Sequence, residues 1–172
     1  GFYNTGTQTL NKKDTVRAYL HLDFFFYSVL DSYISTVDSV TFTGSFTFST
    51  PSGNYYIVVK HRNTIETWSK SGGEAFVCGT VMNYDFTNSI NKAYGNNLTQ
   101  VNSAPLKFAI YSGDTNQDGA IDASDLSTIE NDVSNSTGGY VSTDLTGDDF
   151  VDGSDLSIAE NNSALGVNVI NP

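Results

Sequence analysis

The chain has 172 residues, of which 38% are hydrophobic and 13% aromatic, and a formal net charge of −11 at pH 7. This length and apolar content suffice for a sizeable buried core, and no apolar run approaches the roughly 18 residues of a membrane-spanning helix. An acidic surface makes nucleic acid and anionic lipid poor partners. The composition therefore predicts a globular protein that neither binds nucleic acid nor inserts into a membrane.

The charge is divided unevenly along the chain. Residues 1–113 contain seven acidic residues and all eight Lys and Arg residues, whereas residues 114–172 contain twelve acidic residues and no Lys or Arg. Carboxylates concentrated in one segment repel one another unless cations neutralise them. We therefore expect the folding of residues 114–172 to depend on a bound cation.

Residues 1–112 have the pattern of short β-strands. Five runs are rich in β-branched and aromatic residues and are separated by Gly, Asn, Ser and Pro, which is typical of an all-β sandwich. Within one run, apolar residues alternate with threonine as in a strand with one solvated face, and residues 50–54 are then expected to form a hairpin turn. The single Cys78, in another run, is expected to be a small core residue. The expected strands are residues 16–22, 39–48, 55–60, 76–82 and 106–111.

Residues 114–125 have the pattern of a calcium-binding loop. Such a loop wraps one ion by presenting oxygen ligands at positions 1, 3, 5, 7, 9 and 12, with glycine at position 6 for a sharp turn. Gly119 stands at position 6. The expected ligands are Asp114, Asn116, Asp118, the backbone carbonyl of Ala120, Asp122 and Asp125.

Residues 144–155 repeat this loop. Thr146 offers only a neutral hydroxyl at position 3, and Asp149 replaces glycine at position 6, where the backbone requires a positive φ that few residues adopt freely. The expected ligands are Asp144, Thr146, Asp148, the backbone carbonyl of Phe150, Asp152 and Asp155. The two loops therefore predict two bound Ca²⁺ ions, with the first site tighter than the second.

A short amphipathic helix is expected after each loop, whereas a Gly-containing segment precedes each loop where an EF-hand would have an entering helix. The expected apolar stripes are Leu126, Ile129 and Val133 in the first helix and Leu156, Ala159 and Leu165 in the second. The residues at position 8 of the loops, Ile121 and Val151, are expected to pack and hydrogen-bond with each other.

This duplicated loop-then-helix pattern over residues 113–165 resembles a type I dockerin. In that family, recognition of a cohesin falls largely on loop positions 10 and 11 and on the helix behind them. Residues 114–172 lack the basic residues that cellulosomal dockerins usually carry there. The resemblance implies a partner surface made of Ala123, Ser124, Gly153 and Ser154.

Residues 53–69, with 84–87 and 93–96, resemble secreted surface proteins of the Bacteroidetes and Ignavibacteria. In these proteins a small immunoglobulin-like or prealbumin-like β-sandwich precedes a dockerin-type repeat. The resemblance implies a mainly β protein at the bacterial cell surface or outside the cell. It also implies three parts, namely a sandwich domain of residues 1–112, a dockerin-like calcium-binding domain of residues 113–165 and a strand-like tail of residues 166–172.

The tail alternates like a strand and follows the last expected helix. It is expected either to fold back onto its own sandwich or to complete the sandwich of the next copy by strand addition, which would produce a head-to-tail filament. Val167, Val169 and Ile170 would carry that contact. The abrupt start at Gly1 suggests that a leader or upstream domains have been removed.

The sequence contains no nucleophile elbow, phosphate loop or zinc-ligand spacing, and most acids are assigned to calcium. We therefore expect a non-catalytic, calcium-stabilised structural module or subunit of an extracellular protein or filament, whose partners include identical copies. The alternatives are a module that binds a cohesin-like protein and an adhesin domain that holds a glycan on Trp68 or on the aromatic residues 24–27.

Overall fold

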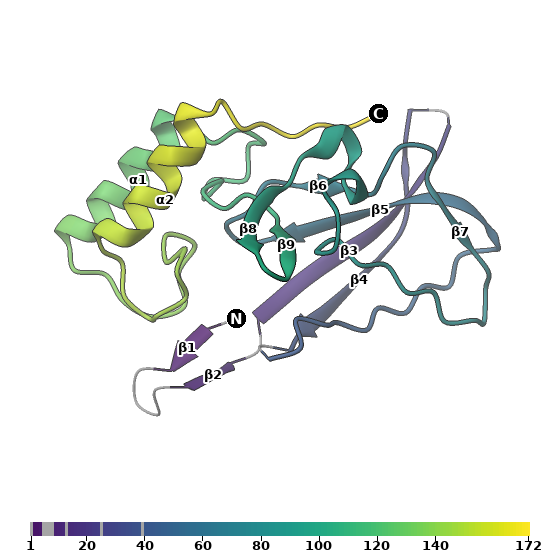
Figure 1. Cartoon of the computed structure of the whole chain (residues 1–172), viewed down its shortest axis with the longest axis horizontal. Coiled ribbons are helices and arrows are strands. Elements are labelled where there is room, and N and C mark those ends of the chain that lie inside the picture. Colours follow the sequence, from purple (N-terminus) through teal and green to yellow (C-terminus); the bar gives the residue numbers. More distant parts are fainter. Residues whose placement is uncertain (1, 5–8, 13, 25, 39) are drawn as a thin grey trace.

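The computed structural model describes residues 2–4, 9–12, 14–24, 26–38 and 40–172. The protein is mainly β, with antiparallel sheets and two helices, as the sequence predicts (Figure 1). The strands are β1 (Phe2–Asn4), β2 (Thr9–Lys12), β3 (Asp14–Leu22), β4 (Val29–Val37), β5 (Gly53–His61), β6 (Thr67–Trp68), β7 (Glu74–Phe76), β8 (Thr99–Ser103) and β9 (Leu106–Ala109). The helices are the 3₁₀ turns η1 (Ile90–Lys92) and η2 (Tyr94–Asn96) and the α-helices α1 (Ala123–Ser134) and α2 (Gly153–Ala164).

Strands β3 to β7 form one antiparallel sheet in the order β4-β3-β5-β6, with β7 also paired to β5. The central strand β5 is apolar at successive positions, so both of its faces are buried. Tyr55 and Ile57 pack with Leu20 on one face, whereas Tyr56 and Val58 pack on the other with the buried Trp68. The core of the β-part therefore lies on both sides of β5.

Two of the expected strands are wrong. Residues 40–48 form no strand, and the run expected over residues 76–82 leaves the sheet after Phe76. Only part of the first run is packed, because the Phe48 ring meets the Phe76 ring edge-on beneath the sheet, whereas Val40 and Phe42 are 75% and 61% exposed. Without that strand, residues 50–54 form no hairpin turn, and Cys78 is exposed rather than in the core, since it lies past the end of β7.

The remaining strand predictions are confirmed, but five described strands, β1, β2, β4, β6 and β8, lie outside every expected run. The expected strands over 16–22 and 55–60 lie within β3 and β5, and the run over 106–111 contains β9. Strands β4 and β8 carry several polar residues and are largely exposed, so their apolar pattern is weak. Pairing with β3 and β9 decides their conformation.

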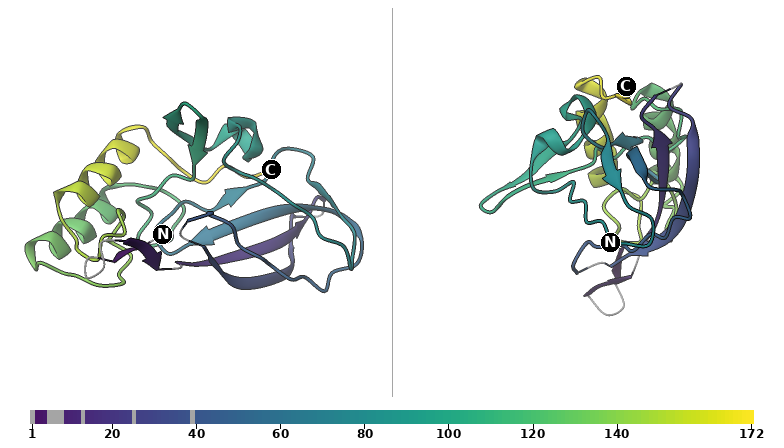
Figure 2. Two further views of the ribbon diagram at one scale, coloured as in Figure 1. Left: turned by 60° about the horizontal axis from the view of Figure 1, so that its bottom comes forward. Right: turned by 90° about the vertical axis from the view of Figure 1, so that its right-hand side faces the viewer.

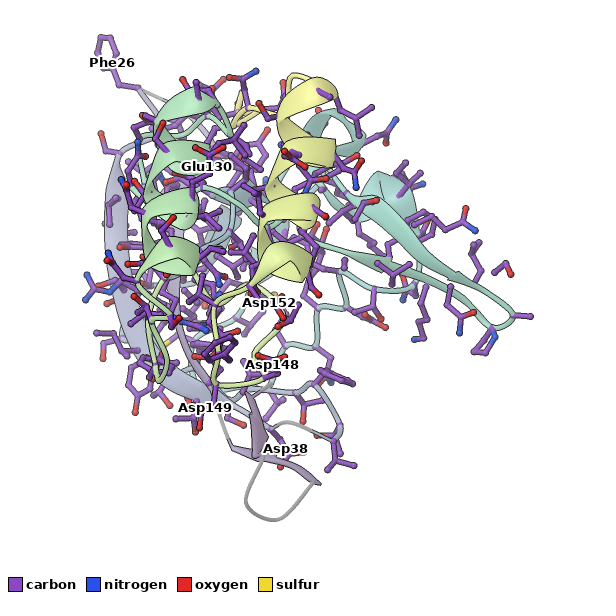
Figure 3. The ribbon with its side chains drawn as sticks, turned by 90° about the vertical axis from the view of Figure 1, so that its left-hand side faces the viewer. Phe26, Asp38, Glu130, Asp148, Asp149 and Asp152 are labelled. Atoms are coloured by element: carbon purple, nitrogen blue, oxygen red, sulfur yellow. The ribbon has the colours of Figure 1, made fainter. Side chains whose placement is uncertain are left out.

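Helices α1 and α2 pack side by side, as Figures 1 and 3 show. Their shared core contains Ile129 and Ala159, both fully buried, and Val151 from the second loop. The predicted stripe of α1 is confirmed, but Leu165 does not continue the stripe of α2, because it lies at the C-cap and is 71% exposed. Each helix begins with a capping box, in which Asp122 or Asp152 accepts a hydrogen bond from the backbone of the first turn.

Candidate metal centre

The two acidic loops that precede α1 and α2 have the same backbone turn at position 6. Gly119 has φ of 94° and Asp149 has φ of 79°. The match between the two loops therefore predicted the positive φ of Asp149 correctly. A glycine would adopt this φ with less strain than an aspartate does. The second loop is closed at the same point as the first despite the substitution.

The carboxylates at positions 1 and 12 share a set of backbone hydrogen bonds in the two loops. Position 1 accepts from the backbone N–H groups of positions 5 and 6, at 3.1 and 3.2 Å for Asp114 and at 3.2 and 3.1 Å for Asp144. Position 12 accepts from the N–H groups of positions 2, 3 and 9, at 2.8 to 3.2 Å for Asp125 and at 2.7 to 2.9 Å for Asp155. These bonds draw each loop around its two end carboxylates.

The carboxylates at positions 5 and 9 shape the exit from each loop. Asp118 accepts from the N–H of Ala120 at 3.0 Å, and Asp148 accepts from the N–H of Phe150 at the same distance. Asp122 and Asp152 are the N-caps of α1 and α2. Figure 3 shows Asp148 and Asp152 at the end of α2 where the second loop lies.

The acids at both ends of each loop are buried among like charges. Asp114, Asp125, Asp144 and Asp155 are at most 2% exposed, and no ion pair between described residues neutralises any of them. Burial, together with the nearby charge of Asp125, raises the pKa of Asp114 to about 6. Burial raises the pKa of Asp144 as well. Buried carboxylates normally have a cationic partner, so a cation bound in each loop would offset the repulsion between these charges.

The donor set of each loop suits calcium better than a softer metal. The oxygen-bearing groups are carboxylates, an amide or hydroxyl at position 3 and a backbone carbonyl at position 7, which are the ligands of hard cations. Among the described residues, no three His, Cys, Asp or Glu side chains converge closely enough to hold a metal by themselves. A cation in these loops would therefore rely on the amide, hydroxyl and carbonyl oxygens as well as on the carboxylates.

Each loop pairs with the segment that follows the helix of the other loop. In the first loop, the N–H of Ile121 donates to Val167 O at 3.0 Å, and Ala120 forms a β-bridge with Asn168. In the second, the N–H of Val151 donates to Thr137 O at 2.9 Å. The pairs are completed by bonds from Val169 N to Gly119 O and from Gly139 N to Asp149 O, both at 2.8 Å, and by a bridge between Phe150 and Gly138.

This exchange corrects two sequence expectations. Ile121 and Val151 do not bond to each other, since Ile121 packs with Ile65 and Val167 while Val151 packs between the helices. The tail is not a free strand, because its first residues are the structural counterpart of the segment after α1. The tail folds back within its own chain, but it pairs with the first loop and not with a strand of the sheet as expected. Val167 is buried there, Val169 half-buried and Ile170 exposed.

The turn after β5 connects the sheet directly to the second loop. Arg62 donates from Nε to the carbonyl oxygen of Val141 and from Nη2 to that of Asp144, both at 3.1 Å. Asn63 donates from Nδ2 to the same Asp144 oxygen at 3.0 Å. Sequence analysis missed both residues, because nothing in their spacing relates them to a loop some eighty residues away.

A buried acid at the start of β3 supports this connection. Asp14 accepts from Arg62 Nη1 at 2.8 Å and from the Tyr140 hydroxyl at 2.7 Å, and His61 Nε2 lies 2.8 Å from its carboxylate. Although burial alone would raise it, these partners hold the pKa of Asp14 well below its ordinary value. The cluster joins β3, the end of β5 and the segment before the second loop.

The predicted partner surfaces differ in accessibility. Ala123, Ser124, Gly153 and Ser154 are all exposed in the first turns of α1 and α2. Trp68, in contrast, is buried beneath Tyr56 and donates from its indole nitrogen to Glu66 at 2.6 Å. Trp68 therefore cannot serve as an exposed platform for a sugar ring.

Comparison with protein-family models, with curated proteins and with solved structures finds no match to this chain. Among the described residues, no helix has the length and apolar character needed to cross a bilayer.

Proposed function

We propose that this chain is a non-catalytic structural module of an extracellular bacterial surface protein or filament, stabilised by two calcium ions. The observation that carries the proposal is the burial of four aspartates, Asp114, Asp125, Asp144 and Asp155, with no cationic side chain paired to them among the described residues. Bound Ca²⁺ would supply the missing positive charge and tie the two ends of each loop together.

The residues that would hold the ions are those at loop positions 1, 3, 5, 7, 9 and 12. Asn116 and Thr146 would serve at position 3, and the carbonyl oxygens of Ala120 and Phe150 at position 7. The second loop would be the weaker site, because Asp149 is strained at a positive φ that Gly119 adopts without strain in the first loop. Millimolar extracellular calcium saturates even sites with dissociation constants of about 10⁻⁴ M.

A structural role explains the other features of the chain. The single exposed Cys78 provides no internal disulfide, so calcium is the available clamp for an extracellular domain of this size. We infer that the β-part is an immunoglobulin-like or prealbumin-like sandwich and that the calcium repeat is dockerin-like. Burial of both faces of β5 supports the first inference, and the symmetric pairing of the two loops supports the second.

Isothermal titration with CaCl₂ tests the calcium proposal. Wild-type protein should bind two ions, and Asp114→Asn and Asp144→Asn should each remove one site. Glu130→Gln is the matched control, since it removes one negative charge from the exposed surface of α1, outside the loops (Figure 3). Binding of fewer than two ions by the wild type, or two full sites in either aspartate variant, would contradict the proposal.

Docking of a cohesin-like protein is the second candidate function. It is favoured by the exposure of Ala123, Ser124, Gly153 and Ser154 at equivalent places in the two helices. Surface plasmon resonance with a purified cohesin domain in the presence of calcium tests it. Binding that is lost in the double variant Ser124→Asp/Ser154→Asp would support docking, and the absence of binding would leave the structural role alone.

A further inference from the structure

Strand β4 is an open edge of the main sheet. It runs for nine residues, pairs with β3 on one side and has no strand partner on the other among the described residues. Val29, Leu30, Tyr33 and Ile34 are all large and more than 40% exposed. A long, apolar edge strand presents unpaired N–H and C=O groups and is a ready template for a strand from another chain.

The described N-terminal strands are an unattached β-ribbon. Strands β1 and β2 pair with each other and with no other described strand. Figures 1 and 2 show this hairpin extending past the end of the sheet at which β3 begins. A two-stranded hairpin alone is marginally stable in water, so it gains most from addition to a larger sheet.

The hairpin and the open edge also have opposite charges. The described strands of the hairpin, β1 and β2, contain Lys12 and no acid, whereas β4 contains Asp31 and no base. Complementary charges favour the encounter of the two surfaces and select against edge-to-edge pairing of two β4 strands.

From these observations we propose that the β1–β2 hairpin of one copy adds to the β4 edge of a second copy. The inference rests on the proposed structural role and names the surface through which copies assemble. Because the two surfaces differ, the contact is heterologous and repeats along an open chain of molecules. Backbone hydrogen bonds would provide the affinity, and the exposed apolar side chains of β4 the specificity.

The segment after β4 forms no ladder with this strand, although its Ser49 and Thr50 contact Asp31 of β4. Its Phe48 packs beneath the sheet in the cluster that contains Leu20 and Phe76. Ser49 is held by a hydrogen bond from its N–H to the Asp31 carboxylate at 2.7 Å. The C-terminal tail does not pair with β4 either, because it pairs with the first calcium loop.

Two variants disable one surface each. Leu10→Pro breaks the hairpin, because proline removes a backbone donor and cannot continue the ladder. Tyr33→Lys places a positive charge on the open edge, where it opposes strand addition and repels Lys12 of the hairpin. Val81→Lys is the matched control, since Val81 is 87% exposed and lies outside every strand. Circular dichroism and calcium titration establish that each variant is folded and binds two ions.

Analytical ultracentrifugation and negative-stain electron microscopy across a concentration series then measure assembly. Wild type and Val81→Lys should form extended assemblies, whereas Leu10→Pro and Tyr33→Lys should each remain monomeric. An equimolar mixture of the two variants should form dimers and nothing larger, because it contains one working hairpin and one working edge per pair.

The interface is refuted if the wild type stays monomeric, if either variant assembles like the wild type, or if the mixture stays monomeric. If the protein binds two calcium ions in these experiments, each of these results contradicts the proposed interface but not the calcium proposal. Loss of calcium binding by the wild type counts against the calcium proposal instead.

Discussion

Asn63 donates a hydrogen bond from Nδ2 to the backbone carbonyl oxygen of Asp144 at 3.0 Å. Asn63 lies in the turn after β5, and Asp144 is the first residue of the second acidic loop. Both residues are buried, so the bond ties the sheet to the loop without competition from water. The sheet and the two acidic loops therefore meet at a residue of the candidate metal site.

Replacement of Asn63 should weaken both parts. We expect Asn63→Ala to lower the free energy of unfolding by about 1–3 kcal/mol, because Asp144 O loses a buried donor. The second calcium site should also lose affinity, while the first is unchanged. Urea denaturation and calcium titration measure the two effects. Asn88→Ala, at an exposed position, is the control, and equal calcium affinities in Asn63→Ala and the wild type would argue against a role of this bond at the site.

Exchange of the residues at loop position 6 should reverse the order of the two sites. Asp149→Gly relieves a positive φ at a non-glycine residue and should stabilise the second loop by about 1 kcal/mol. Gly119→Asp should weaken the first loop, both through its φ of 94° and because a Cβ there would lie 3.3 Å from a methyl carbon of Val169. Site-resolved calcium titration by NMR tests this prediction, and it fails if both exchanges leave the order of affinities unchanged.

Calcium-free protein should lose stability as the pH rises from about 4 to about 6. The pKa of Asp114 is raised from 3.8 to about 6 in the folded chain. Its contribution is therefore fully present below the unfolded pKa and is lost as the pH rises through the folded one. We expect a loss of about 1–2 kcal/mol, measured by urea denaturation in a chelator. Asp114→Asn should reduce this slope and leave the part due to Asp144, whose pKa is also raised, and an unchanged slope in that variant would assign the effect to other groups.

Truncation of a tail side chain should destabilise the first loop. Val167 is buried with Ile65 and Ile121, so Val167→Ala leaves a cavity between the sheet, the loop and the tail. The expected loss is about 1–3 kcal/mol, with weaker calcium binding at the first site. Thermal unfolding with and without calcium measures it. The control Val101→Ala removes the same atoms from an exposed position on β8 and should change little.

Chelation of calcium should lower the thermal stability of the sheet as well as that of the loops. The only tryptophan, Trp68, packs on β5 in a cluster that also contains Val169 of the tail. Removal of calcium should therefore lower the melting temperature reported by Trp68 fluorescence together with that of the helices reported by circular dichroism. A sheet whose melting temperature is independent of calcium would show that the contacts through Asn63 and Val167 do not couple the two parts.

The sequence alone determined the features that depend on local chemistry. The spacing of Asp, Asn, Thr and Gly predicts the two loops, their turn at position 6 and the helices behind them, because each depends on residues within one short segment. A run rich in β-branched and aromatic residues likewise predicts β3, and a continuous apolar run predicts β5, since a strand buried on both faces must be apolar at successive positions.

Only the tertiary structure decided what depends on distant partners. Residues 40–48 alternate like a strand, yet Phe48 is satisfied by packing beneath the sheet, whereas the largely exposed β4 becomes a strand through its pairing with β3. The pairing of the tail with the first loop and the bond from Asn63 to Asp144 join segments far apart in the chain. Local periodicity carries no record of such contacts, because their free energy arises only when the folded chain brings the partners together.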